Sequence, residues 1–155
     1  MSEETWGDVA GRLGVDERGQ FHRLPVRVYF EDTDAGGVVY HASYVRFCER
    51  GRTDFLRLLG VEARQLISGE ASNEPAAFVV RRMSLDFKRP ARMDDLLVVE
   101  TRVKELGGAS VTLNQVVSRE GRPVFEADVV VVLVSVAGKP LRLSDAIRVA
   151  FEGQD

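Results

Sequence analysis

The sequence predicts an α+β fold in which a mainly antiparallel sheet of five strands wraps around one long central helix. Two observations carry this prediction. Only residues 43–59 repeat their apolar side chains over several turns at three- and four-residue steps, as an amphipathic helix does. One strand-like segment precedes them and four follow, separated by short Gly- or Pro-containing segments. The 155 residues are long enough for a real core and most simply form one domain.

The chain before the helix divides into two parts. Residues 1–20 are polar and Gly-containing without sustained periodicity, so we predict a mobile N-terminal extension there, with at most one short helix, and a single folded domain over 21–155. Residues 24–30 (LPVRVYF) alternate as a strand does, with Val26, Val28 and Phe30 on one face.

The central helix has recognisable ends. Ser43 is a plausible N-cap and Gly60 a natural stop. The apolar stripe consists of Tyr44, Phe47, Cys48, Gly51, Phe55, Leu58 and Leu59, and the charged residues, Asp54 among them, fall largely off it. Glycine costs about 1 kcal/mol against alanine inside a helix, so Gly51 predicts a close approach between helix and sheet.

The second half of the chain is dominated by strand signals. Residues 61–75 connect the helix to segments predicted as strands at 77–88, 96–105, 109–119 and 124–136. The continuously apolar run 129–133 is typical of a strand covered on both faces. Residues 144–151 predict a closing helix.

Composition limits the function classes. A net charge of -3 argues against nucleic acid as the main partner. The single cysteine excludes an internal disulfide and fits a reducing compartment. No apolar run approaches the ~20 residues of a membrane span, and the N-terminal residues lack the pattern of a signal peptide. We therefore expect a cytoplasmic protein.

The segment Glu31–His41 (EDTDAGGVVYH) contains the candidate catalytic groups. It combines three carboxylates, two adjacent glycines and one of the two histidines, between a strand and a helix. A carboxylate supplies a base or nucleophile, and the amides of a helix start supply hydrogen-bond donors. This combination suits hydrolysis of an acyl compound.

These residues resemble the hotdog-fold acyl-CoA thioesterases. The similarity is strongest to the 4-hydroxybenzoyl-CoA thioesterase-like group and its YbgC-type branch, which is linked to the bacterial Tol-Pal system. It rests on segments 26–44, 47–56, 77–81 and 90–95, and extends from about residue 24 to the end. It implies a hotdog fold, acyl-CoA thioesterase activity without a metal or redox cofactor, and a homodimer or homotetramer with sites between subunits.

Carried over by position, the resemblance implies that Asp34 is the catalytic carboxylate and His41 an adjacent site residue. It also implies that backbone amides around Val39, Tyr40 and His41 polarise the thioester carbonyl. Phe30 departs from the pattern, because many YbgC-type sequences have tyrosine there.

Each candidate also has a plainer interpretation. Asp34 could merely shape the turn, as Asp beside glycine often does, and His41 could be an ordinary surface histidine. A calcium loop is disfavoured because Ser43 stands where the twelfth, acidic ligand belongs. Few histidines and one cysteine disfavour zinc. Cys48 is expected in the core, Glu49 as a solvated acid paired with Arg46 or Arg52, and His22 without a role.

Basic residues gather around one predicted strand and the turn after it, namely Arg81, Arg82, Lys88, Arg89 and Arg92. They either guard a sheet edge against aggregation or bind the phosphates of coenzyme A. The sequence leaves both readings open.

The sequence therefore predicts hydrolysis of an acyl-CoA thioester, with Asp34 as general base or nucleophile. Two rivals remain: a non-catalytic acyl-CoA or acyl-carrier-protein binder or scaffold, and a hotdog dehydratase or hydratase. The sequence does not determine acyl chain length, or whether coenzyme A or acyl-carrier protein is the carrier.

Overall fold

The computed structural model describes residues 5, 7–61, 63–69 and 74–153. In chain order the elements are β1 (Arg12–Asp16), β2 (Gly19–Arg27), the 3-10 helix η1 (Phe30–Asp32), α1 (His41–Leu58), α2 (Ala63–Ser68), β3 (Ala76–Phe87), β4 (Leu96–Leu106), β5 (Ser110–Arg119), β6 (Arg122–Ser135) and α3 (Asp145–Glu152). None of these helices is long and apolar enough to cross a membrane.

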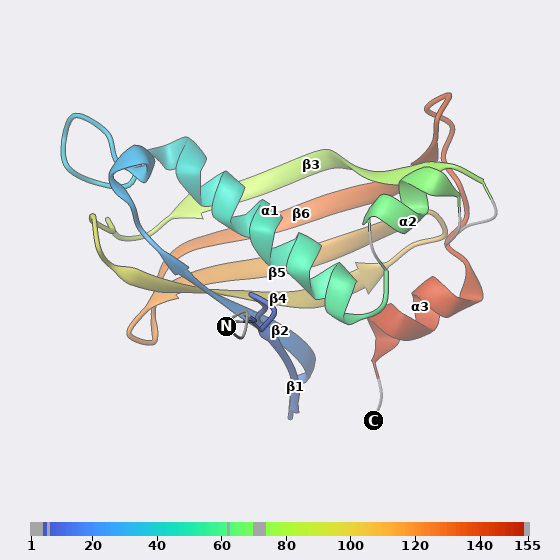
Figure 1. Cartoon of the computed structure of the whole chain (residues 1–155), viewed down its shortest axis with the longest axis horizontal. Helices are drawn as coiled ribbons and strands as arrows, with labels where there is room; N and C mark the ends of the chain where they lie inside the picture. The colour runs from blue at the N-terminus through green and yellow to red at the C-terminus, as the bar shows by residue number, and fades with distance from the viewer. Residues whose placement is uncertain (1–4, 6, 62, 70–73, 154–155) are drawn as a thin grey trace.

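The strands form one antiparallel sheet in the order β1-β2-β4-β5-β6-β3, and α1 lies along one face of it (Figure 1). The predicted α+β fold, an antiparallel sheet around a central helix, is confirmed. The sheet has six strands instead of the predicted five, because Arg12–Asp16, part of the expected extension, pairs with β2 through a turn at residues 17 and 18. Most side chains of β1 are exposed, so its sequence lacks the apolar alternation that would predict a strand.

The start of α1 differs from the prediction. Tyr40 is the N-cap, so Ser43 lies inside the first turn. The Ser43 hydroxyl instead donates to the backbone carbonyl of Asp32, 3.1 Å away, and ties the helix to the preceding loop. The helix ends at Leu58, and Gly60 follows with φ of 87°, a conformation that glycine adopts without strain.

Gly51 marks the close approach that the sequence predicts. A Cβ atom there would lie 2.7 Å from Cγ1 of Val99 and 3.2 Å from Nε2 of Gln115, both on the sheet. Any larger residue would push helix and sheet apart. The glycine therefore sets how deeply α1 sits in the curved sheet.

The apolar stripe of α1 packs into a continuous core. Tyr44, Phe47, Cys48 and Phe55 are all buried. The Tyr44 ring stacks on that of Phe125 in β6 at a centroid distance of 5.0 Å. Burial raises the pKa of the Cys48 thiol to about 12, which excludes a thiolate nucleophile at neutral pH. Cys48 is a core residue, as predicted.

His22 and Asp54 form a buried pair that corrects two predictions. The His22 Nε2 atom lies 2.6 Å from a carboxylate oxygen of Asp54, and both side chains are almost fully buried. That same oxygen accepts the Gly11 amide at 2.8 Å, and Arg57 donates to the other oxygen. Asp54 is thus a junction between α1, β2 and the N-terminal segment. His22 therefore has a structural role, and the Asp54 side chain faces the core and not the solvent.

The proton on His22 can be assigned from its surroundings. Its Nδ1 atom is buried and lacks a hydrogen-bond partner among the residues described. A proton there would be an unpaired buried donor, so the neutral ring with a proton on Nε2 fits best. Burial, the largest influence, lowers the pKa of His22 below its ordinary 6.5, although the bond to Asp54 opposes it.

We expect the free energy of unfolding to decrease as the pH falls below about 6.5, where His22 of the unfolded chain begins to bind protons. Folded His22 has the lower pKa, so protons favour the unfolded state there, with a slope of at most about 1.4 kcal/mol per pH unit. At higher pH, His22 is neutral in both the folded and the unfolded chain, so it adds no pH dependence to the free energy of unfolding. Urea unfolding between about pH 5.5 and 7.5 measures it. The variant His22→Phe should lose this part of the slope; an unchanged slope would contradict the assignment.

The strand β3 leaves one edge of the sheet open. It pairs only with β6, and its far side forms no ladder with the strands described. Val80, Leu85 and Phe87 point to the concave side of the sheet and remain 44%, 39% and 50% exposed. A long apolar edge of this kind is an aggregation liability unless another chain covers it.

Candidate active site

The loop between β2 and α1 lies at one end of the sheet, at the left of Figure 1. Asp32 organises it. Its carboxylate accepts the Tyr29 amide at 2.8 Å, and its carbonyl accepts the Tyr40 amide at 2.8 Å. Asp32 is only 4% exposed. It is therefore a structural residue, and Glu31 beside it is exposed to solvent.

Asp34 is exposed and lies two residues before the first of the two glycines. Its Oδ1 accepts the Gly36 amide at 2.8 Å, and its carbonyl accepts the Gly37 amide at 3.0 Å. Gly37 has φ of 81°, which favours glycine. The turn-shaping interpretation of Asp34 is thus correct. It leaves Oδ2 without a hydrogen-bond partner among the described residues, so a catalytic role is compatible with it.

The helix start offers fewer amides than the sequence suggests. The Val39 amide donates to the Ala91 carbonyl at 2.8 Å, and the Tyr40 amide donates to Asp32. These internal bonds correct the prediction that Val39 and Tyr40 supply oxyanion donors. Within the described structure, the amides of His41 and Ala42 have no such partner. They are the open donors at the positive end of the α1 dipole.

His41 lies beside a small pocket of about 240 Å³ formed with Tyr44, Phe87, Lys88 and Arg89. Its ring is 4.3 Å from that of Tyr40 and 6.3 Å from that of Phe87, measured between centroids. The structure therefore brings His41 together with two of the predicted basic residues at the end of β3.

The five basic residues separate into two groups. Lys88 lies 3.4 Å from Glu126, Arg89 donates to the Pro123 carbonyl, and Arg92 bridges to Val38 in the site loop. These three lie near the loop. Arg81 and Arg82 are instead exposed in the middle of the edge strand, where the register shifts by one residue.

Other predicted site residues fall outside this region. Phe30 is 81% exposed on η1, so a hydroxyl added there would face solvent in this chain. Glu49 is exposed and forms no ion pair with Arg46 or Arg52 among the described residues, contrary to the prediction. No group of three metal-ligating side chains occurs in the part of the chain that the structure describes.

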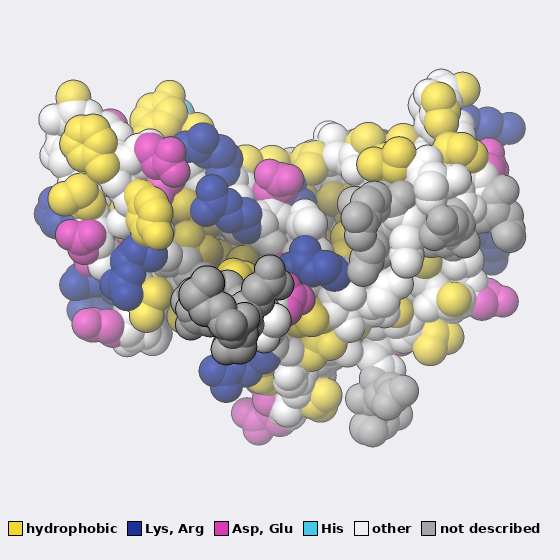
Figure 2. All heavy atoms as spheres, viewed as in Figure 1, with side chains coloured by type: hydrophobic (Ala, Val, Ile, Leu, Met, Phe, Trp, Pro, Cys, Tyr) yellow, Lys and Arg dark blue, Asp and Glu magenta, His cyan; other side chains and the backbone are white. Residues whose placement is uncertain are grey.

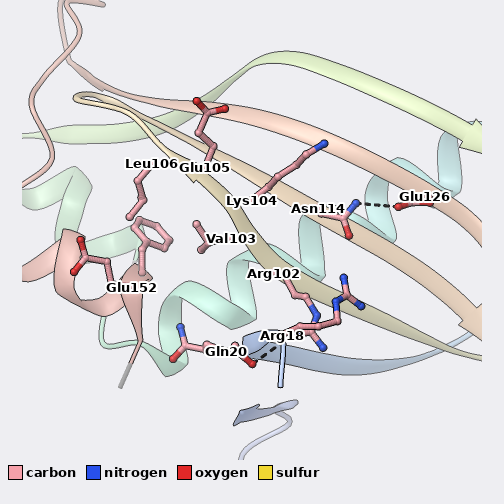
Figure 3. A pocket seen from close by; sticks show the side chains of 12 residues that line it. Arg18, Gln20, Arg102, Val103, Lys104, Glu105, Leu106, Asn114, Glu126 and Glu152 are labelled. Carbon is pink, nitrogen blue, oxygen red and sulfur yellow. Dashed lines mark hydrogen bonds between the residues drawn. The ribbon is translucent and has the colours of Figure 1, made fainter. Parts of the chain in front are cut away.

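A larger hollow, about 580 Å³, lies on the other face of the sheet, with α1 behind it (Figure 3). Two of the three cations that line it are already paired: Arg102 with Asp16 at 2.5 Å, and Lys104 with Asp128 at 2.6 Å. None of its carboxylates, such as Glu105 and Glu152, precedes the start of a helix with open amides. We assign the active site to the loop and helix start.

Sequence reasoning missed the His22–Asp54 pair, although a signal was present. In the alternation of the strand, His22 shares a face with Val26 and Val28, which are buried. Asp54 stands three residues after Gly51, at the margin of the apolar stripe. A histidine and a carboxylate that both face the core each need a buried hydrogen-bond partner, so their pairing could have been predicted.

A helix cradled in an antiparallel sheet, with a carboxylate before its open amides, defines the hotdog thioesterase class. The chain belongs to the Thioesterase superfamily, whose family model matches residues 36–135. The predicted resemblance is confirmed.

Proteins with similar sequences or structures are named as thioesterases. The Acyl-CoA thioester hydrolase YbgC of Escherichia coli O6:H1 is 45% identical over 132 residues, covering 84% of this chain and 95% of the relative. The Acyl-CoA thioesterase YbgC of Haemophilus influenzae is 42% identical over 129 residues, covering 83% and 92%. A crystal structure of a probable thioesterase from Bartonella henselae has 44% identity and a TM-score of 0.78, covering 80% of this chain and 99% of its own.

Proposed function

We propose that the protein hydrolyses acyl-CoA thioesters to a free carboxylate and coenzyme A. The observation that carries this proposal is the exposed Asp34 carboxylate, held by the Gly36 amide just before the open amides of His41 and Ala42. Relatives named acyl-CoA thioesterases at 42–45% identity support it.

Each part has a chemical role. The free oxygen of Asp34 takes a proton from water as the water attacks the carbonyl carbon, or attacks that carbon itself to form a mixed anhydride. The His41 and Ala42 amides stabilise the negative charge that develops on the carbonyl oxygen. The carbon–sulfur bond then breaks, and the thiol leaves with a proton. Neither route needs a metal or a redox cofactor.

The nucleotide end of coenzyme A carries phosphates that require cations. Lys88, Arg89 and Arg92 are exposed and lie next to the pocket at His41 or to the loop. We assign the phosphates to these three. Arg81 and Arg82 are better suited to guarding the edge of β3 or to contacting a partner subunit.

The protein acts as a homodimer, or as a homotetramer built from two dimers. The open apolar edge of β3 supports this proposal. Antiparallel pairing of two β3 strands about a twofold axis would cover Val80, Leu85 and Phe87 and join the two sheets. The family resemblance supports a cytoplasmic location, an association with the Tol-Pal system, and acyl-carrier protein as an alternative carrier.

We expect light scattering during size-exclusion chromatography to give at least twice the 17.2 kDa chain mass. Val80→Lys would place a charge on the concave side of β3 and should shift the protein towards monomer with loss of activity. Lys139→Ala, a change in an exposed turn, serves as the control. A fully active monomer would contradict the shared site.

Hydrolysis of a panel of acyl-CoA and acyl-carrier-protein substrates, followed by release of free thiol, tests the function. We expect turnover with at least one acyl group. An enoyl absorbance change without thiol release would indicate a dehydratase. Binding without turnover across the panel would indicate a binding protein.

His41→Ala should lower kcat by about tenfold, less than a change of the carboxylate, because the backbone amide survives the substitution. The ring lines the pocket at the end of β3, so KM should rise as well. A loss as large as that of an Asp34 variant, at unchanged KM, would make His41 a primary catalytic group.

A further inference from the structure

A second, apolar pocket lies on the concave face of the sheet, between the later turns of α1, α2 and β3. It has a volume of about 260 Å³. Its walls are formed by Leu56, Leu66, Phe78, Leu113, Val131 and Phe151. Among the described residues that line it, the polar side chains, Glu49, Arg52 and Thr53, all come from α1. An apolar space with a few polar groups is typical of a small-molecule subsite.

Arg52 is the notable side chain of this pocket. It is half-buried, and no carboxylate lies within ion-pair distance of it among the described residues. Its recorded contact is a long hydrogen bond of 3.4 Å from one terminal nitrogen to Oε1 of Gln115. Burial, the largest influence, lowers the pKa of the Arg52 guanidinium, and the nearby Glu49 carboxylate opposes this effect. A guanidinium has five N–H donors, so most remain available.

Gln115 fixes the position of Arg52 at this contact. The Gln115 side chain is fully buried, and its Nε2 donates to the Cys48 carbonyl at 2.8 Å and to the Thr101 hydroxyl at 2.9 Å. Because both amide hydrogens are used, Oε1 must face Arg52. The guanidinium is thereby held at the pocket by the core of the sheet.

The pocket is placed to serve the active site of a partner. Val80 lines the pocket, and Phe87, at the other end of β3, lies beside His41. Val80 and Phe87 are seven strand residues apart, which at about 3.3 Å per residue is about 23 Å. Antiparallel pairing of two β3 strands about a twofold axis midway between Val80 and Phe87 would bring the far end of the partner's β3 next to Val80. The catalytic loop of the partner subunit would then face this pocket.

We propose that the pocket receives the acyl chain of the substrate and that Arg52 selects chains ending in a carboxylate, so that the enzyme prefers coenzyme A monothioesters of dicarboxylic acids. The inference rests on the proposed thioesterase function. The apolar walls take the methylene stem, and the planar fork of Arg52 pairs with the terminal carboxylate. Glu49 also lines the pocket and acts on Arg52, but its side chain is exposed and can turn to solvent when a substrate carboxylate binds.

The test compares coenzyme A thioesters of equal length that end in a methyl, a hydroxyl or a carboxylate group, for example octanoyl-, 8-hydroxyoctanoyl- and 7-carboxyheptanoyl-CoA. The purified wild-type protein should show at least a tenfold higher kcat/KM for the carboxylate-ended substrate than for the methyl-ended one. Arg52→Met keeps the apolar stem and removes the charge. It should reverse this order, mainly through KM. Arg52→Lys should retain part of the preference.

Arg46→Met provides the matched control, because Arg46 is exposed on the same helix, where Figure 2 shows basic side chains gathered, and does not line the pocket. A wild-type preference for the methyl- or hydroxyl-ended substrate would overturn the proposal. So would an equal loss on all three substrates in Arg52→Met, which would make Arg52 structural. Absence of thiol release from every substrate would instead refute the proposed function itself.

Discussion

Replacement of Asp34 by asparagine should lower kcat by about 10²–10⁴ and leave the fold and acyl-CoA affinity nearly unchanged. The amide keeps an oxygen that can accept the Gly36 hydrogen bond, so the turn before α1 should persist. What is lost is the second, unpaired oxygen with its negative charge. An amide can neither take a proton from water effectively nor act as a comparable nucleophile.

The measurement is steady-state thiol release, with substrate affinity determined separately. Glu31→Gln is the matched control, because Glu31 is an exposed carboxylate three residues earlier in the same loop. It should retain most of the activity. A kcat close to wild type in purified, folded Asp34→Asn would remove Asp34 from the mechanism while leaving the family assignment intact.

Replacement of Asp54 by alanine should lower the free energy of unfolding by about 2–4 kcal/mol. Its carboxylate accepts hydrogen bonds from Gly11, His22 and Arg57, which belong to three separate segments. Alanine would leave the buried His22 ring and the partly buried Gly11 amide without an acceptor. The expected consequence is a weakened attachment of β1 and β2 to α1, in addition to the lost stability.

Urea unfolding measures this change, and hydrogen exchange in β1 reports whether the N-terminal hairpin loosens. Asp54→Asn keeps one acceptor oxygen and should cost less. Glu105 is an exposed carboxylate near the end of β4 that forms no ion pair with the residues described, so Glu105→Ala should change stability by less than about 0.5 kcal/mol. Equal stability of Asp54→Ala and wild type would show that the junction contributes nothing.

Much of the fold followed from the sequence because its signals are periodic and local. The stripe from Tyr44 to Phe55 predicted α1, and alternation predicted four strands of the second half within two residues of their observed ends. The hairpin strand β1 was missed, because five mostly exposed residues carry no such pattern. The short helix α2 was missed as well.

The candidate site was predicted less completely. The residue types in the segment 31–41 indicated a carboxylate beside a helix start, and the loop has that arrangement. The Ala91 and Asp32 carbonyls accept the Val39 and Tyr40 amides and so determine which amides at the helix start remain open. Ala91 lies about fifty residues after Val39 in the chain. The sequence could not reveal that Val39 and Tyr40 were already paired.

The sequence by itself determined the family, the central helix, and the carboxylate and glycines before it, because each depends on residues close together in the chain. Only the tertiary structure decided the partners of buried polar groups: Asp54 with His22, and Gln115 with Arg52. Such pairs join positions 32 and 63 residues apart. Their chemistry follows from burial, which a chain acquires only when its helix and sheet pack against each other.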